Sequence, residues 1–274
     1  MNSLEAAMRV LKLVDQSRPV LRVGEVSREL GLQKSTVSRL LRTMSEHELI
    51  ERERDGQGYV AGRRALVLAD LYLSAHTLLD LVAEAIDALV DEFTFVGYAA
   101  ALSGPDIVIL RVKHGRYPLR LVQEVGKRLP AWLTAIGRSL IARRPDGEIS
   151  ALVEAGPDTP KPAAVLAEIG KIRRAGIAFA ESAIIPGIGA IGASVGDSSG
   201  NEALGFSLSY PLSATDKHTR DLMVERVREE GRRIGARLGD PFWSAIDPAA
   251  HIIDIDRKRP PGGRRSSLRQ KATA

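Results

Sequence analysis

The sequence predicts an α+β protein with two folded units joined by a single helix. In residues 1–64, hydrophobic residues recur at three- and four-residue spacing in three successive stretches, and two strand-like stretches around a glycine turn follow. In residues 78–245, helical patterns alternate with strand patterns that flank turn sequences. Residues 65–77 are apolar on more than one helical face, so we expect a linker helix that packs against another subunit as well as its own.

The composition limits the chemistry open to the chain. Its 274 residues suffice for one large or two smaller domains. The absence of cysteine excludes disulfides, Cys-ligated metals and cysteine nucleophiles. No apolar run approaches the ~20 residues that a membrane helix needs, and residues 1–10 lack the apolar core of a signal peptide. We therefore expect a cytoplasmic protein with no membrane partner.

Positive charge gathers at the two ends of the chain. Residues 1–65 carry a net charge of +3 and residues 257–274 carry +7, whereas residues 66–256 carry −5. This distribution predicts a polyanionic partner at the ends. The Pro-, Gly-, Ser- and Arg-rich composition of residues 246–274 predicts a disordered basic tail, which is either a solvated extension or a non-specific aid to polyanion binding.

The first unit reads as three helices followed by a hairpin. Gly31 ends the second helix, as glycine often does, and Asp55–Gly58 form a tight turn between the strands. The expected elements are residues 3–15, 23–30 and 34–48 as helices and residues 50–54 and 59–61 as strands.

The second unit reads as a mixture of helices and short strands without internal repeats. After the linker helix at 65–75, we expect helices at 78–92, 134–144, 163–174 and 215–238, and strands at 96–102, 107–113, 119–124, 176–180, 188–195 and 203–209.

Three helices, a glycine turn and a hairpin are the pattern of a winged helix-turn-helix, whose third helix enters the major groove of duplex DNA. Its buried stripe leaves an exposed face made of residue types that touch phosphates and base edges: Lys34, Ser35, Thr36, Ser38, Arg39 and Arg42. Arg54, Gln57 and Tyr59 of the hairpin are expected to reach the backbone or the minor groove. Which of Arg39 and Arg42 reads a base stays open.

At this point the sequence resembles the IclR family of bacterial regulators over residues 3–240. Leu30–Leu41 is close to the recognition-helix pattern of that family, and Thr134–Ala142 resembles the helix beside its effector loop. Pro186–Ile188 with Ala193–Val195, and Ser207–Ser209, resemble two of its strands.

The resemblance implies a winged helix-turn-helix domain joined by a linker and dimerisation helix to a GAF-like effector-binding domain. It implies a homodimer or a dimer of dimers, and a small effector that changes the affinity for double-stranded operator DNA. It also implies a transcription regulator, in many relatives a repressor, of a catabolic operon.

In relatives that bind small carboxylates, the effector pocket pairs an Asp, a Cys and two serines with backbone amides. Ser207 and Ser209 match the serine positions, whereas Ala180 and Ala190 stand where the resemblance places the Asp and the Cys. The two methyl groups favour a ligand larger or more apolar than glyoxylate or pyruvate, so we expect an aromatic or extended organic acid.

Two further features complete the expected pocket. Trp132 is a candidate aromatic wall, and the backbone N–H groups of Ala135, Ile136 and Gly137 are candidate donors to a carboxylate. The alternative is that the two serines only satisfy hydrogen bonds of the sheet and that Trp132 belongs to the core.

No pattern indicates catalysis. The five histidines are scattered without metal-ligand spacing, and no Gly-x-Ser-x-Gly elbow occurs. The glycines at 187, 189 and 192 are not followed by the Lys-Ser/Thr of a phosphate loop. We expect no catalytic residue, metal or cofactor. The alternatives are a regulator without a ligand and an enzyme fused to a DNA-binding head.

Overall fold

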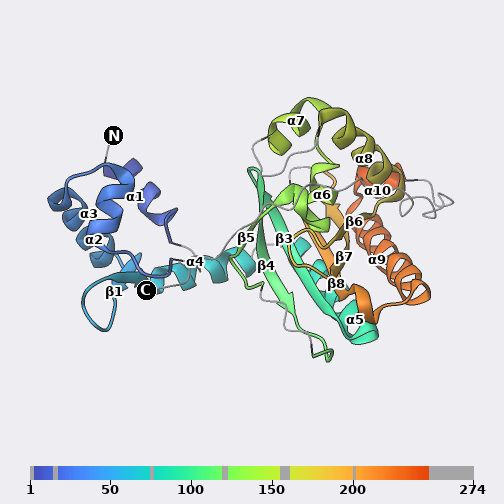
Figure 1. Ribbon diagram of the computed structural model, residues 1–274, viewed down its shortest axis with the longest axis horizontal. Helices are drawn as coiled ribbons and strands as arrows, with labels where there is room; N and C mark the ends of the chain where they lie inside the picture. The colour runs from blue at the N-terminus through green and yellow to red at the C-terminus, as the bar shows by residue number, and fades with distance from the viewer. Residues whose placement is uncertain are drawn as a thin grey trace.

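The computed structural model describes residues 3–14, 18–74, 77–118, 123–154, 161–199 and 202–246. They form a small head and a larger body, with helix α4 (Arg63–Ser74) running between the two (Figure 1). The predicted α+β architecture is confirmed. The predicted basic tail lies outside the described residues, apart from its first position at 246.

The head follows the predicted order of elements closely. Gly31 adopts a φ of 65°, in the left-handed region, and its N–H donates to the carbonyl of Ser27, which ends the second helix. The elements are α1 (Ser3–Leu11), α2 (Val23–Leu30), α3 (Lys34–Glu46), β1 (Ile50–Arg52) and β2 (Tyr59–Ala61). A single apolar core joins them: Val10, Leu21, Val26, Leu30, Val37, Leu41, Met44, Ile50 and Tyr59.

Helix α4 exposes large apolar side chains in the single chain. Leu66 is 73% exposed, Leu68 55% and Leu71 58%. Among the described helices, none is by itself long and apolar enough to cross a membrane, and α4 meets that test only as a bent pair with α5 (Thr77–Phe93). Helix α4 thus carries a large exposed apolar surface in the single chain.

The body is built on a six-stranded antiparallel sheet with the strand order β5-β4-β3-β8-β7-β6. The central strands pair over most of their length, and the edge strands are short. The strands are β3 (Val96–Ser103), β4 (Asp106–Lys113), β5 (Arg128–Pro130), β6 (Ala178–Glu181), β7 (Ile188–Gly196) and β8 (Ala203–Pro211).

Helices cover both faces of this sheet, because alternate residues of the central strands are apolar on each side. One face carries α5, α9 (Lys217–Leu238) and α10 (Pro241–Ser244). The other carries the short turn η1 (Ala131–Leu133), α6 (Ala135–Ile141), α7 (Asp146–Glu154) and α8 (Pro162–Ala175) (Figure 1). Each face has its own apolar core.

Three elements differ from the sequence expectation. The strand expected at 119–124 lies largely outside the described residues, and the edge position next to β4 is taken by β5 instead. A proline in β5 removes one backbone donor, which an edge strand tolerates. Helices α7 and α10 were not predicted, because each is short and has a weak apolar pattern of its own.

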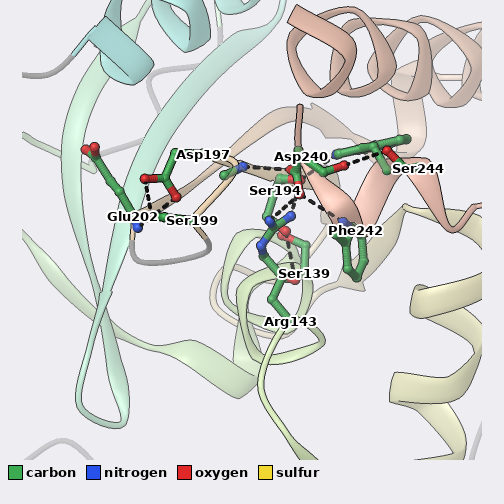
Figure 2. Close-up of polar contacts among 11 residues, drawn as sticks. Ser139, Arg143, Ser194, Asp197, Ser199, Glu202, Asp240, Phe242 and Ser244 are labelled. Carbon is green, nitrogen blue, oxygen red and sulfur yellow. Dashed lines mark hydrogen bonds and ion pairs between the residues drawn. The ribbon is translucent and has the colours of Figure 1, made fainter. Parts of the chain in front are cut away.

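A buried polar cluster fastens α10 to the sheet and to the end of α6 (Figure 2). Arg143 Nη2 lies 2.7 Å from Asp240 Oδ1, which also accepts from the N–H of Phe242 at 3.0 Å. Asp240 Oδ2 accepts from the N–H of Gly196 at 2.8 Å. The carboxylate is fully buried and both of its oxygens are bonded, so its desolvation is compensated by an ion pair and two backbone donors.

Trp243 completes the attachment of α10. Its Nε1 donates to the carbonyl of Ser194 at 2.8 Å. Side chains at Gly231 or Gly235 of α9 would collide with the indole ring, so these two glycines make room for it. The tryptophan thus packs against helix α9 while it bonds to strand β7.

Candidate functional site

The exposed face of α3 is the candidate DNA interface. Lys34, Ser35, Ser38, Arg39 and Arg42 are exposed. Thr36 is half-buried. The amphipathic pattern of α3 produces this arrangement, because its apolar side chains face the core of the head. The helix therefore presents cations and hydroxyl groups on one surface.

The cations of this face differ in their partners. Arg42 Nε lies 3.6 Å from Glu46 Oε1, one turn further along α3. Within the described part of the chain, Lys34 and Arg39 have no carboxylate partner. An exposed pair of this kind contributes little, so a DNA phosphate can compete with Glu46 for Arg42, and Lys34 and Arg39 are available without competition.

The hairpin β1–β2 forms the candidate wing. Its tip turns at Gly56, whose φ is 75°, and Asp55 Oδ1 accepts from the N–H of Gln57 at 3.0 Å. Arg54 and Gln57 are exposed there. Both side chains are thus placed where a wing can contact the DNA backbone.

The expected contact of Tyr59 with DNA is not supported by its position. Tyr59 is 4% exposed and belongs to the core of the head. Its backbone exchanges hydrogen bonds with Leu21, and the guanidinium of Arg52 covers its ring with Cζ at 4.9 Å from the centroid. The backbone of Tyr59 thus bridges the wing to the segment before α2, and its side chain faces the core of the head.

A cavity of about 80 Å³ lies on the α6 face of the body sheet. Strands β3, β4, β7 and β8 form its floor, and α6 and the turn after β6 form its walls. Most of its lining is aliphatic: Ile107, Ile109, Leu129, Leu133, Ala135, Ile136, Ala180, Ala183, Ile184, Ile185, Ile188 and Ala190. Its polar lining residues are Tyr98, Gln123, Thr134, Ser207 and Ser209.

Strand register brings together residues that are far apart in sequence. Ser207 pairs with Tyr98 of β3, and Ser209 pairs with Ala190 of β7. Ala190 in turn pairs with Ala180 of β6. Since paired residues share a face, the two serines and the two alanines singled out in the sequence all reach the cavity. Among the described residues, no hydrogen-bond partner is present for either serine hydroxyl.

Two further residues that line the cavity each carry a buried polar atom without a described partner. Tyr98 Oη and Gln123 Oε1 have no hydrogen-bond partner within the described part of the chain. Burial raises the pKa of the Tyr98 hydroxyl, which therefore stays protonated at neutral pH. Sequence reasoning missed both residues. Tyr98 could have been found from strand alternation once its pairing with Ser207 was known, whereas Gln123 carried no signal.

Trp132 is placed differently from the expectation of an aromatic wall, because it is not among the described residues that line the cavity. It packs in the adjoining core, where the guanidinium of Arg138 lies over its ring with Cζ at 5.1 Å from the centroid. Arg138 Nε also donates to the Trp132 carbonyl at 2.7 Å. Tyr98 supplies the aromatic surface instead.

The expected donor at Gly137 is already occupied. Its N–H donates to Thr134 Oγ1 at 2.9 Å, which caps α6. A side chain at Gly137 would collide with the carbonyl of Ala131, so glycine allows α6 to pack closely on η1. Ala135 and Ile136 line the cavity, whereas Gly137 lies behind them.

The fold and the two candidate sites together define a class of protein. A winged helix-turn-helix head is carried on a body with a partly open cavity, and the described residues contain no cluster of three or more potential metal-binding side chains. Residues 3–54 match the IclR helix-turn-helix domain, and residues 70–236 match the domain described as bacterial transcriptional regulator IclR C-terminal. The two matched domains define a DNA-binding transcription regulator.

The chain belongs to the IclR family of bacterial transcriptional regulators. It is 24% identical to the regulator XynR of Escherichia coli K12 over 87% of this chain and 98% of that protein. It is 26% identical to the regulator KdgR of the same organism over 84% of this chain and 90% of that protein.

Solved structures share the whole fold. An IclR transcriptional regulator from Alicyclobacillus acidocaldarius superposes with a TM-score of 0.74 at 18% identity, covering 88% of this chain and 98% of that one. An IclR homolog from Microbacterium hydrocarbonoxydans in complex with 4-hydroxybenzoate gives a TM-score of 0.70 at 22% identity, covering 87% and 99%.

Proposed function

We propose that the protein is a cytoplasmic repressor of a catabolic operon, whose operator affinity is changed by a small organic-acid or aromatic effector bound in the body. The observation that carries this proposal is the cavity, which combines aliphatic walls with hydroxyl groups and lies in the domain that α4 connects to the DNA-binding head. Ligand sites typically have this composition.

Relatives support the finer parts of the proposal. One relative is the transcriptional repressor IclR of Escherichia coli, 20% identical over 77% of this chain, and another is the repressor AllR of Klebsiella pneumoniae, 21% identical over 86%. The 4-hydroxybenzoate in the Microbacterium homolog is an aromatic acid. These names describe those proteins, and we extend them to this chain as a hypothesis.

The exposed side chains of the head define the DNA contacts that we propose. We assign base and phosphate contacts to α3, and backbone contacts to the wing. The residues are Lys34, Ser35, Thr36, Ser38, Arg39, Arg42, Arg54 and Gln57. Their cationic and hydroxyl groups are the types that contact DNA.

We further propose that α4 pairs with α4 of a second copy of this chain. Three of its leucines, Leu66, Leu68 and Leu71, are more than half exposed in the single chain, and burial of such a surface stabilises an interface. Light scattering after size-exclusion chromatography should detect a dimer, or a dimer of dimers, and Leu68→Glu should shift it towards monomer. Leu166→Glu on α8, also at an exposed apolar position, is the matched control.

The effector hypothesis is tested by two measurements on the same panel of aromatic acids, phenols and short keto acids. Thermal shift should identify compounds that bind. Fluorescence anisotropy with DNA from upstream of the gene should then show a change of fivefold or more in operator affinity, as expected for a typical coupling energy. If no compound changes either quantity, the protein is a regulator that works without a ligand of these classes.

A further inference from the structure

Two residues that line the cavity carry unpaired polar atoms, which restrict the chemistry of a ligand. Tyr98 Oη comes from strand β3 and Gln123 Oε1 from the segment between β4 and β5. Both atoms are buried, both residues line the cavity, and neither atom has a partner among the described residues. A buried polar atom without a hydrogen bond destabilises a protein, so each such atom needs an explanation.

The two atoms differ in what they accept and donate. A protonated tyrosine hydroxyl donates one hydrogen bond and can accept others, whereas an amide oxygen only accepts. A ligand group that bonds Gln123 Oε1 must therefore donate a hydrogen, and one that uses the proton of Tyr98 must accept it. A hydroxyl group can do both, whereas a carboxylate has no hydrogen to donate.

The lack of charge in the cavity lining also favours a neutral ligand. The described lining of the cavity contains only neutral side chains. The nearby cation Arg138 is held elsewhere, since Nε donates to the Trp132 carbonyl at 2.7 Å and Nη1 to the Phe179 carbonyl at 2.8 Å. A carboxylate buried here would lack an available cation from the described residues, and burial of an unpaired charge is costly.

The other hydroxyl groups complete the match. Ser207 and Ser209 lie on the floor and each offers a donor and an acceptor. Thr134 also lines the cavity, but its Oγ1 is used in capping α6. The outer wall consists of Ala183, Ile184 and Ile185, which are exposed or half-buried, so only this thin wall separates the cavity from solvent on that side.

We propose that the effector is an uncharged molecule with a small apolar body and a hydroxyl group, of the phenol or alcohol class, and that Tyr98 and Gln123 bind this hydroxyl. The inference rests on the proposed effector function and refines its chemistry, since it replaces an acid by a neutral hydroxyl compound. Tyr98 and Gln123 thereby become the residues that determine specificity.

The test is isothermal titration calorimetry of the full chain with four matched probes: phenol, anisole, toluene and benzoate. Anisole can accept but cannot donate, toluene can do neither, and benzoate carries a charge. We expect phenol to bind at least tenfold more tightly than each of the others. Tighter binding of benzoate than of phenol would overturn the proposal while leaving the effector function intact. If all four probes and the wider panel fail to bind, the effector function itself fails.

Two variants separate a role in recognition from a role in folding. Tyr98→Phe and Gln123→Met should each weaken phenol binding about tenfold and leave toluene binding unchanged. Tyr117→Phe removes a tyrosine hydroxyl from the opposite face of the sheet, where the ring packs on Phe95, and should leave both affinities unchanged. Equal loss of phenol and toluene binding in Tyr98→Phe and Gln123→Met would show that the cavity had collapsed and would contradict a specific contact with the hydroxyl.

Discussion

Two sets of buried polar groups lie beside the body sheet, and they differ in whether the groups are hydrogen-bonded. In the cluster around Asp240, both carboxylate oxygens are bonded, to Arg143, Phe242 and Gly196 (Figure 2). In the cavity, Tyr98 Oη and Gln123 Oε1 are buried without a described partner. The paired cluster fastens α10 and leaves no polar group for a ligand. The two unpaired atoms make no hydrogen bond within the described fold, so they can bond a ligand.

The same contrast appears on the recognition helix. Arg42 has Glu46 as a partner, whereas Arg39 has none among the described residues. Unpaired polar groups thus occur at the two surfaces that we assign to recognition, one for DNA and one for a ligand. The paired cluster around Asp240, in contrast, joins α10 to the sheet and to the end of α6. Substitutions of paired and of unpaired groups test this contrast.

The largest effect is expected from breaking the paired cluster. Asp240→Asn removes the negative charge and leaves the nearly buried Arg143 without a counter-ion. The free energy of unfolding should fall by about 3–5 kcal/mol, the usual cost of breaking a buried ion pair. Urea unfolding followed by tryptophan fluorescence measures it. Asp106→Asn, which removes a half-exposed partner of Arg128, is the control and should cost under ~1 kcal/mol.

A smaller effect is expected on operator affinity when Arg39, which has no described carboxylate partner, is replaced. Arg39→Ala should weaken operator binding by about 1–3 kcal/mol if Arg39 contacts a base edge, without changing the unfolding midpoint. Fluorescence anisotropy at fixed salt measures it. The companion variant Arg42→Ala should weaken binding less, because Glu46 already competes for that guanidinium. Full operator affinity in both variants would contradict the assignment of α3.

For the unpaired hydroxyl of Tyr98 we expect the opposite effect on stability from that of the Asp240 cluster. Tyr98→Phe should leave the ligand-free protein as stable as the wild type or raise its stability by up to ~1 kcal/mol, since the lost hydroxyl has no described partner. Differential scanning calorimetry without ligand measures it. A clear loss of stability would mean that the hydroxyl is bonded in solution.

The smallest effect concerns an exposed carboxylate in the same capping role. Asp216 caps α9 as Asp240 caps α10, and the hydrogen bond from the N–H of Thr219 lowers the pKa of Asp216. A lowered pKa means that the carboxylate stabilises the fold at neutral pH and that this contribution is lost as the pH falls through the folded-state pKa. The difference in Tm between wild type and Asp216→Ala should therefore shrink between pH 7 and pH 3. A difference that stays constant over this range would exclude a contribution from the charge.

Much of the head could be predicted because its determinants are local. Helical periodicity, Gly31 and the glycine turn of the wing are visible within a few residues, and they placed the exposed face of α3 correctly. Tyr59 was misassigned because its inward orientation depends on pairing with Leu21, almost forty residues earlier in the chain. Strand alternation alone does not say which face is covered.

In the body, less could be predicted from the sequence. By itself, the sequence determined the order of most helices and strands, the common face of Ser207 and Ser209 and, through the family resemblance, the likeness to a ligand-binding domain. Only the tertiary structure decided that Tyr98 and Gln123 join those serines while Arg138 turns away towards Trp132 and Phe179. The physical reason is that local periodicity depends on neighbouring residues, whereas a cavity depends on the register of strands that are distant in sequence and on which polar atoms the packed elements leave without partners.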